Sequence, residues 1–461
     1  MINESLNIED RDKTRIHLSD QEIEEITEAL RAQDADTLHS HLKDLSIADT
    51  ADLISKIHGD DRSELLSMCS ETLDPHVFTE MDDELCRHIV SALPSDQVVS
   101  IISSLESDDA LDLVVNLDED LQQDIIRKLS TKIRTSLKEG LSFPEDSAGR
   151  LMQREAVAVP QFWSVGKTID YLREAANDLP EEFFDIFVIN PTYHVTGQIP
   201  LNRLVRSERD IKLDSLTLEE THPIPAQMDQ EEAAHIFRRD NVTSAPLIDE
   251  NGRLIGVITI DDIVDVIDDE AEEDILKMAG VDQGDLYRAA ISTTGKRFRW
   301  LFINLLTAIL ASVVISFFDA TIEEIIALAV LMPIVASMGG NAGTQALTVA
   351  VRALATRELS ETNAWRIIWK ETFVGFMNGI SFAAITGLVT IVWFQDIALG
   401  AIIAMAMITN LFVAGFFGTS IPIYLNKSGS DPAVASTVLL TTLTDVVGFF
   451  SFLGLAALFL L

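Results

Sequence analysis

Five long apolar stretches occupy the last third of the chain and restrict its fold most strongly. They run over residues 300–318, 325–351, 372–395, 397–426 and 433–461. Apart from Asp445 in the last stretch, none of them contains Asp, Glu, Lys or Arg. An α-helix needs about 20 apolar residues to cross the hydrocarbon core of a bilayer, and each stretch is long enough to do so. The sequence therefore predicts a membrane domain of five transmembrane helices over residues 296–461.

The distribution of charge divides the chain into two parts. The whole sequence has 34 Lys+Arg and 73 Asp+Glu, a formal net charge of -39, although its mean hydropathy is +0.21. Most of the acidic side chains precede residue 296, where they far outnumber the basic ones. Such an acidic surface attracts cations and repels nucleic acid, so we expect no nucleic-acid partner. The two cysteines, Cys69 and Cys86, lack metal-ligand spacing and suit a reducing cytoplasm.

The loops between the apolar stretches predict how the chain crosses the membrane. One set of loops carries the positive charge, at Lys296, Arg297, Arg299, Arg352, Arg357, Arg366, Lys370 and Lys427. The alternate loops contain Asp319, Glu323, Glu324 and Asp396. By the positive-inside rule, the acidic N-terminal part lies in the cytoplasm and the C-terminus lies outside. We therefore expect a multi-pass protein of the plasma (inner) membrane, and the polar start of the chain predicts no cleavable signal peptide.

A repeated helical pattern fills residues 1–140. Apolar pairs at Leu53-Ile54, Ile89-Val90 and Leu113-Val114 are each followed by another apolar pair at the same interval along the chain. Apolar positions at i, i+1 and i+4 mark the buried faces of helices, and acidic turns separate them. The pattern predicts an acidic helical-repeat N-domain of stacked helical hairpins.

Residues 145–268 alternate between short strands and helices in two similar halves. Phe187-Val188-Ile189 in one half matches Ala245-Pro246-Leu247-Ile248 in the other, and each run precedes a turn and a second strand. Gly197 and Gly256 occupy equivalent positions in the two second strands. The two halves resemble a tandem pair of cystathionine-β-synthase (CBS) domains.

The second of these halves carries a nucleotide-binding pattern. Gly256-Val257-Ile258-Thr259-Ile260-Asp261-Asp262 matches the Gly-hydrophobic-hydrophobic-Thr-x-x-Asp motif of the CBS family. The resemblance implies that Thr259 and Asp262 hold the ribose of an adenine nucleotide such as ATP. Pro200 and Arg203 stand at the equivalent positions of the first half, which is therefore not expected to bind nucleotide. A pure scaffold role is the alternative.

An acidic run leads from the CBS pair toward the membrane domain. Residues 261–274 hold nine carboxylates and no Lys or Arg. Asp262, Asp265, Asp269 and Glu273 fall on one face of a helix. Like charges spaced by four destabilise a helix by roughly 0.2–0.5 kcal/mol per pair. Divalent cations that bridge these carboxylates to another domain would relieve the repulsion; a solvated acidic face is the alternative. The run predicts an acidic connecting helix over 269–295.

Two of the apolar stretches carry polar stripes. In the second stretch, Asn341, Thr344, Gln345 and Thr348 recur with helical spacing. In the fifth, Thr437, Thr441 and Asp445 are spaced by four. A charged side chain near the bilayer centre costs about 2.5–3.5 kcal/mol on insertion scales, so it is tolerated mainly where it faces a polar path. We interpret Asp445 as part of a cation site in a pore; a protonated Asp bonded to a neighbouring helix is the alternative.

The whole chain resembles the MgtE family of magnesium channels and transporters. The resemblance rests on the order of the domains, on Pro333 followed by Gly339-Gly340-Asn341-x-Gly343-x-Gln345, and on the final Thr444-Asp445. It implies a multidomain α and α/β protein with an α-helical membrane domain, which forms a homodimer around a pore. The implied pore ligands of Mg²⁺ are Asp445, Thr441, Asn341 and Gln345. The implied regulatory Mg²⁺ ligands are Asp262, Asp265, Glu270, Glu273, Asp274 and Asp431.

The resemblance implies a Mg²⁺ channel that imports the ion and closes when cytosolic Mg²⁺ binds the acidic domain. Oxygen ligands suit hydrated Mg²⁺, and none of the nine His lies in an apolar stretch, as a softer metal would require. Thr441 departs from the Ala that is common in the family, which could alter the contacts with the hydrated ion. A Co²⁺ or other divalent importer, or one driven by protons through titration of Asp445, is the alternative. A membrane-anchored nucleotide sensor is a third. No nucleophile–base pair or phosphate loop indicates an enzyme.

Overall fold

The computed structural model describes residues 18–69, 72–176, 179–180, 183–218, 220–281, 284–285, 287–288, 290–360 and 362–461. The chain forms two compact units, Met1–Asp268 and Asp269–Leu461. Of the N-domain expected over 1–140, the segment 1–17 lies outside the described residues.

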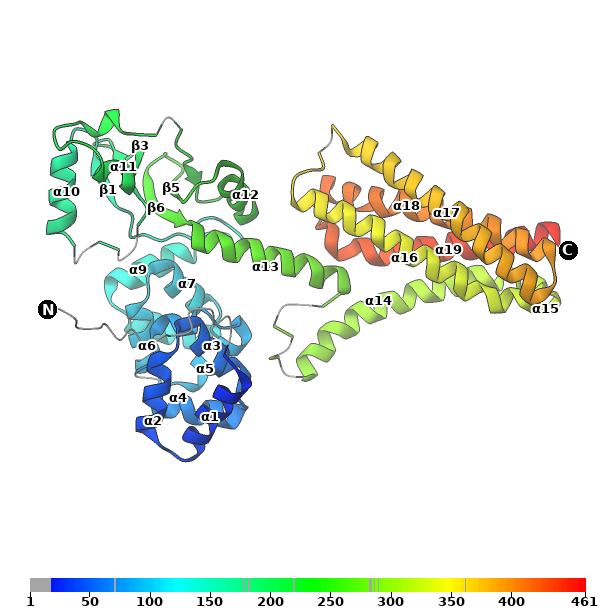
Figure 1. Ribbon diagram of the computed structural model, residues 1–461, viewed down its shortest axis with the longest axis horizontal. Coiled ribbons are helices and arrows are strands. Elements are labelled where there is room, and N and C mark those ends of the chain that lie inside the picture. The colour runs from blue at the N-terminus through cyan, green and yellow to red at the C-terminus, as the bar shows by residue number, and fades with distance from the viewer. Residues whose placement is uncertain are drawn as a thin grey trace, which may run out of the picture. The chain divides into compact units, whose positions relative to one another are not determined.

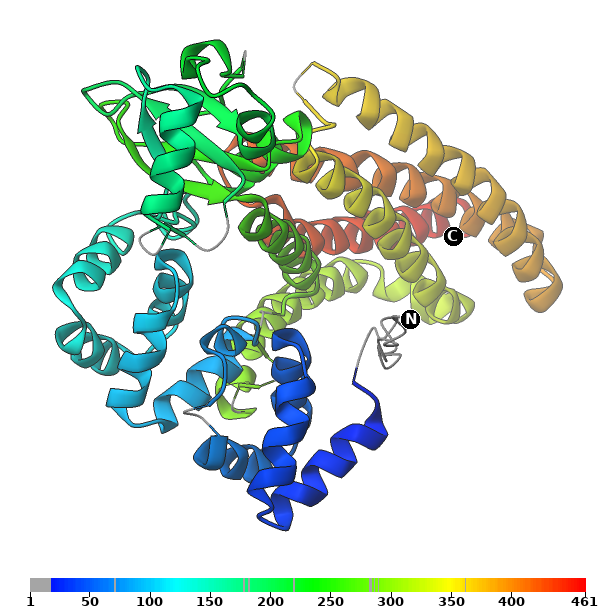
Figure 2. The same cartoon turned by 60° about the vertical axis from the view of Figure 1, so that its left-hand side comes forward.

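The N-terminal part of the first unit is a curved row of short helices (Figure 2). Its elements are α1 (Asp20–Arg31), α2 (Ala35–Asp44), α3 (Ile47–Lys56), α4 (Gly59–Cys69), η1 (Pro75–Phe78), α5 (Asp83–Ala92), α6 (Ser95–Ser104), α7 (Ser107–Val115), α8 (Glu119–Lys128) and α9 (Thr131–Gly140). The apolar pairs of the repeat lie inside, with Leu53, Ile54, Ile89, Val90, Leu113 and Val114 all buried. Serine and aspartate side chains cap several of these helices, for example Ser46 on α3 and Asp82 on α5. The predicted helical N-domain is confirmed.

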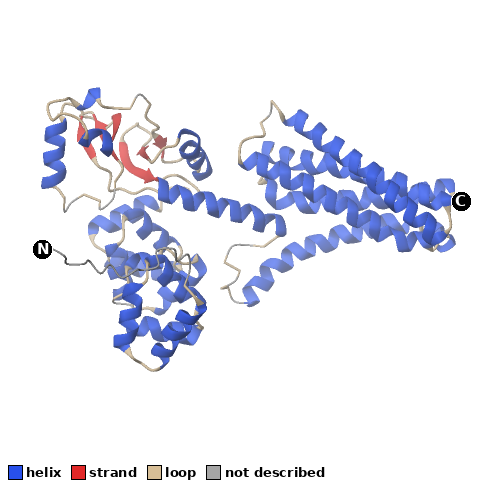
Figure 3. Cartoon of the chain, viewed as in Figure 1, coloured by secondary structure: helices blue, strands red, loops and turns tan. Residues whose placement is uncertain are grey.

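Two small sheets follow, whose strands are red in Figure 3, and the two sheets have the same strand order. The first contains β1 (Ala158–Pro160), β2 (Asp185–Ile189) and β3 (Val195–Pro200), with helices α10 (Val165–Glu174) and α11 (Leu201–Val205). The second contains β4 (Ile224–Pro225), β5 (Ser244–Ile248) and β6 (Leu254–Thr259), with helix α12 (Gln230–Asp240). In each sheet the first two strands are parallel and the last two antiparallel. Val188 pairs with Gly197 as Leu247 pairs with Gly256, so the predicted duplication extends to strand register.

Helix α13 (Ile260–Ala279) follows β6 directly (Figure 1). It begins before the expected connecting helix over 269–295 and ends well before residue 295. Gly280 has φ +71°, its N–H donates to the Lys277 carbonyl, and the Val281 N–H donates to the Leu276 carbonyl. This pair of bonds with a left-handed glycine is the Schellman arrangement that ends helices. The next helix, α14, begins at Ala290.

The second unit is a helical bundle. It contains α14 (Ala290–Ser316), α15 (Asp319–Glu324), α16 (Ala327–Ala355), α17 (Ala364–Phe394), α18 (Ile397–Lys427) and α19 (Pro432–Phe459). All of these except α15 are long and apolar enough to cross a membrane, which gives five candidate spans within the described residues. Helix α18 packs against α16, α17 and α19 and is the most buried of the five. The predicted five-helix membrane domain is confirmed as a fold.

Candidate functional site

The first candidate site lies where the N-domain contacts the second CBS copy, inside the first unit. Ser107, at the start of α7, donates a hydrogen bond to Glu155 at 2.7 Å and accepts one from the Arg154 N–H at 2.8 Å. The neighbouring Glu106 carboxylate accepts a hydrogen bond from Gln153. These contacts hold the N-terminus of α7 against the CBS pair and bring its acidic residues close to those at the start of α13.

The acidic residues at this contact repel one another. Burial and the charge of Asp262 raise the pKa of Asp108 well above its usual range. Burial and the neighbouring Asp261 raise the pKa of Asp262 to about 7, although Thr259 opposes the shift. Burial and the charges of Asp261 and Asp265 raise the pKa of Asp109, while His76 lowers it. Carboxylates that are crowded and buried in this way favour a proton or a bound cation.

Asp265 belongs to the same crowded surface. Burial, followed by the charges of Glu80 and Asp261, raises its pKa. Within the described residues, no three His, Cys, Asp or Glu side chains converge closely enough to hold a metal ion directly.

The predicted nucleotide pair is adjacent in the structure. The Thr259 hydroxyl donates to the Asp262 carboxylate at 2.9 Å. At the equivalent positions of the first copy, Pro200 precedes α11, and Arg203 donates to the carbonyls of Leu216 and Thr217. The first copy therefore lacks the Thr–Asp pair.

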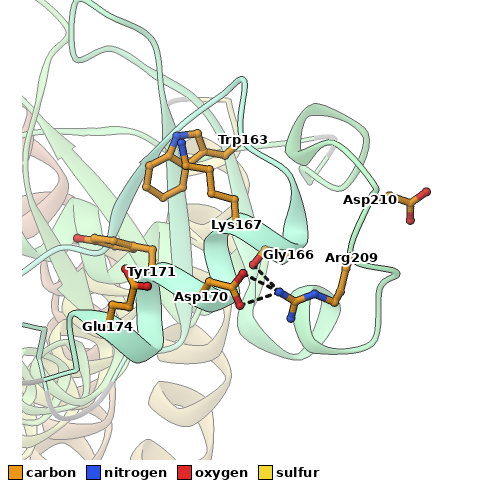
Figure 4. A pocket seen from close by; sticks show the side chains of 8 residues that line it. All are labelled: Trp163, Gly166, Lys167, Asp170, Tyr171, Glu174, Arg209 and Asp210. Atoms are coloured by element: carbon orange, nitrogen blue, oxygen red, sulfur yellow. Dashed lines mark hydrogen bonds and ion pairs between the residues drawn. The ribbon is translucent and has the colours of Figure 1, made fainter.

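A separate hollow of about 590 Å³ lies beside α10 of the first CBS copy. Figure 4 labels its lining residues, among which Arg209 donates to both carboxylate oxygens of Asp170, at 2.6 and 2.7 Å, and to the Gly166 carbonyl. Lys167 lies 4.4 Å from the centre of the Trp163 ring. This hollow contains neither Thr259 nor Asp262, so it is distinct from the predicted nucleotide position.

The second candidate site lies in the second unit, where the end of α13 meets the start of α19. Lys277 forms ion pairs with Glu273 at 2.6 Å and with Asp431 at 2.9 Å. Although burial lowers the pKa of Lys277, its hydrogen bonds to Glu273 and Asp431 raise it. Burial and the charge of Asp431 raise the pKa of Asp274 to about 6, and Glu270 and Glu273 add to this effect. Glu270, Glu273, Asp274 and Asp431 thus influence one another electrostatically, with one lysine among them.

The end of α13 is also held by apolar and backbone contacts. Met278 packs against the cluster of Leu347, Val351, Ala433 and Leu440, which come from α16 and α19. The carbonyl oxygen of Met278 accepts a hydrogen bond from the Thr437 hydroxyl at 3.2 Å. Within the second unit, α13 therefore ends on the helix pair that carries the polar stripes.

The third candidate site is formed by these two stripes. On α16, the side chains of Asn341, Thr344, Gln345 and Thr348 are exposed. The opposite face of α16, with Val335, Gly339 and Gly343, is buried. On α19, Thr441 and Asp445 are partly exposed. The Thr441 hydroxyl donates to the carbonyls of Thr437 and Val438 in its own helix, which leaves its oxygen lone pairs able to accept.

The packing of α16 against α19 sets the relative height of these residues. A Cβ added at Gly343 would lie 3.0 Å from the Leu440 side chain, and one added at Gly448 would lie 3.3 Å from Val335. The later position on α16 contacts the earlier position on α19, so the two helices are antiparallel neighbours. This register puts Asn341 of α16 level with Thr441 of α19, and Asp445 lies about one turn further along α19. Gln345 falls one turn from Asn341 on the other side.

The chain matches known proteins over most of its length. Residues 332–455 match the family model of the divalent cation transporter MgtE, residues 45–146 match the MgtE intracellular N domain, and residues 217–269 match the CBS domain. It is 32% identical to the magnesium transporter MgtE of Bacillus subtilis (strain 168), covering 69% of this chain and 71% of that relative. It is also 32% identical to the magnesium transporter MgtE of Thermus thermophilus, and that match covers 72% of this chain and 74% of the relative.

A solved structure shares the architecture of the first unit. It is the crystal structure of the cytosolic domain of the Mg²⁺ channel MgtE in complex with ATP, with 26% sequence identity and a TM-score of 0.50. The match covers 53% of this chain and 99% of that structure. The helical N-domain, CBS pair and membrane helices thus define a divalent cation transporter. The chain belongs to the MgtE family.

Proposed function

We propose that this protein is a Mg²⁺-selective channel or transporter that imports Mg²⁺ into the cytoplasm and closes when cytosolic Mg²⁺ binds its acidic domain. The observation that carries the proposal is the end of α13 packed on α16 and α19, the two helices that hold the polar stripes. The relatives in Bacillus subtilis and Thermus thermophilus are magnesium transporters, which supports the choice of ion.

Conduction would use the exposed stripes in a homodimer. Two copies of Asp445, one from each protomer, would face one hydrated Mg²⁺, with Asn341, Thr441 and Gln345 contacting its water shell. Mg²⁺ dehydrates reluctantly, so a small number of carboxylates with neutral oxygen donors suits it better than a fully charged cage. The topology that goes with this proposal has a cytoplasmic N-terminus and an external C-terminus in the plasma (inner) membrane.

Closure would follow from charge compensation along α13. When Mg²⁺ is scarce, Asp262 and Asp265 repel the acidic start of α7, and Asp274 repels Asp431. Each bound Mg²⁺ offsets two of these charges and favours the packed form. Lys277 supplies one permanent positive charge at the α13–α19 contact, so the helix end stays partly docked when no Mg²⁺ is present.

Adenine-nucleotide binding at the second CBS copy is a second proposal. It is favoured by the hydrogen-bonded pair of Thr259 and Asp262, which the first copy lacks. The related cytosolic domain was crystallised with ATP, which supports ATP as the nucleotide to test first.

Proteolysis tests the role of Mg²⁺ in closure. We expect millimolar Mg²⁺ to slow protease cleavage of the cytoplasmic domain several-fold, because bridged carboxylates hold the N-domain, CBS pair and α13 together. Asp265→Asn combined with Glu273→Gln should remove most of this protection. Glu208→Gln combined with Asp214→Asn is the matched control, since it neutralises two exposed acids of the first CBS copy. Identical cleavage with Mg²⁺ and with chelator would mean that the acidic run is only a solvated face.

The same assay has a predicted pH dependence. The pKa of Asp262 is raised to about 7, so the packed state holds a proton that the unpacked state has released. The resulting stability of the packed state is lost as pH rises from the ordinary carboxyl range up to about 7, by at most about 1.4 kcal/mol per pH unit for one group. With chelator present, protection should therefore increase from pH 8 to pH 6, and Mg²⁺ should reduce the difference. Protection that decreased on acidification would contradict this assignment.

A further inference from the structure

Helix α18 contains a fully buried amide, Asn410, within a candidate membrane span. Its Nδ2 donates a hydrogen bond to the Val335 carbonyl of α16 at 2.8 Å. Its Oδ1 is buried and accepts no hydrogen bond from any described residue. A buried, partly unsatisfied amide is unfavourable where no bulk water can reach it. Asn410 therefore lowers the stability that the packing of α18 gives to the folded protein. An apolar side chain of the same size would avoid this cost.

The two neighbouring helices are shaped around this amide. A Cβ added at Gly339 of α16 would overlap the Asn410 amide nitrogen, and one added at Gly448 of α19 would lie 2.8 Å from it. Asn410 therefore fits between two glycines, one on each stripe-bearing helix. Gly448 follows Asp445 by three positions, and Gly339 precedes Asn341 by two. The buried amide thus touches α16 and α19 at the height of Asp445.

We propose that Asn410 is a positioning residue for the cation site formed by Asp445 and Asn341. It binds α16 through the Val335 carbonyl and packs on α19 at Gly448, which fixes the separation and register of the two helices. Mg²⁺ demands near-octahedral geometry, so a small shift between the helices changes how well the water shell is held. The inference rests on the proposed Mg²⁺ conduction and adds a residue from a third helix, which does not itself touch the ion.

Asn410→Leu in the full-length protein tests the proposal. We expect normal yield and unchanged or higher thermal stability, because the unsatisfied amide is removed. In proteoliposomes, the Mg²⁺ concentration for half-maximal uptake should rise about tenfold, and uptake of Mg²⁺ relative to Ca²⁺ should fall, since small misplacements of site groups have effects of this order. Thr419→Val is the matched control: Thr419 is buried in α18, but its hydroxyl donates to the Gly415 carbonyl of the same helix at 2.9 Å rather than to a neighbouring helix.

A compensating pair covers the case in which Asn410→Leu does not fold. Gly339→Ala should impair folding because its methyl group overlaps the amide, and adding Asn410→Ala should restore folded protein. In this double variant, the Mg²⁺ concentration for half-maximal uptake should still be about tenfold higher than in the wild type. Wild-type affinity and selectivity in either folded variant would overturn the proposal, as would failure of both to fold, which would leave Asn410 a folding residue only. A wild-type protein that transports no Mg²⁺ would instead refute the proposed function.

Discussion

Replacing Asp445 by Asn is expected to reduce Mg²⁺ uptake by at least about tenfold, which corresponds to ~1.4 kcal/mol. The substitution keeps the size of the side chain and removes the negative charge that attracts the ion. Ala should be at least as damaging because it also removes the oxygen donors. Uptake into proteoliposomes at equal protein amounts provides the measurement.

The control for this experiment is Asp319→Asn. Asp319 is an exposed acid at the start of α15 in the same unit, and its substitution should leave flux unchanged. Thermal stability of the Asp445→Asn variant should stay close to that of the wild type, because the polar stripe is partly exposed. Normal Mg²⁺ flux through the Asp445→Asn variant would refute the assignment of Asp445 to the pore and favour a structural role for this carboxylate.

Deleting residues 1–270 is expected to leave Mg²⁺ flux that internal Mg²⁺ no longer stops. The deletion removes the first unit and the crowded contact between α7 and α13, so Mg²⁺ loses Asp262, Asp265 and Glu270, half of the proposed regulatory ligands. Shifting an equilibrium from 1:99 to 99:1 needs about 5.5 kcal/mol of differential binding, which several weak sites can supply together. Patch recordings with stepped internal Mg²⁺ measure the effect.

Single substitutions distinguish a distributed sensor from one dominant site. Asp262→Asn, Asp265→Asn or Asp274→Asn should each raise the internal Mg²⁺ needed for closure by a modest step. A truncated protein that closed at the same internal Mg²⁺ as the full chain would show that the sensor lies outside the deleted part.

The architecture could be predicted because its signals are local in the sequence. Charge-free apolar stretches of span length, apolar pairs with helical spacing, and two similar strand–turn–strand runs around Gly197 and Gly256 each indicate their element directly. The end of the connecting helix also has a local signal, because Gly280 is a residue type that commonly ends helices. The prediction of a helix over 269–295 passes over this glycine and is therefore too long.

The contacts across the chain could not be predicted in the same way. Asp108 and Asp109 look like ordinary acids in the first turn of a helix, where a negative charge interacts favourably with the helix dipole. Only the folded structure brings them close to Asp262. Lys277 lies just after the acidic run, and its ion pair with Asp431 joins positions far apart in the sequence. Asn410 reads as one polar residue in an apolar stretch, and its partner Val335 lies on another helix, 75 positions earlier in the chain. Sequence spacing carries no signal for such pairs, because each member is compatible with many partners until the helices pack.

Mg²⁺ flux into liposomes that hold only the purified wild-type protein measures self-regulated Mg²⁺ conduction without other proteins. We expect uptake down a Mg²⁺ gradient, unaffected by an imposed pH gradient and suppressed when millimolar Mg²⁺ is present on the side of the cytoplasmic domain. Proton-dependent uptake would favour the proton-coupled importer. Uptake of Co²⁺ in preference to Mg²⁺ would mean that Co²⁺ is the transported ion. No uptake of Mg²⁺ at any internal Mg²⁺ concentration would refute Mg²⁺ conduction by this protein and leave a membrane-anchored nucleotide sensor as the remaining hypothesis.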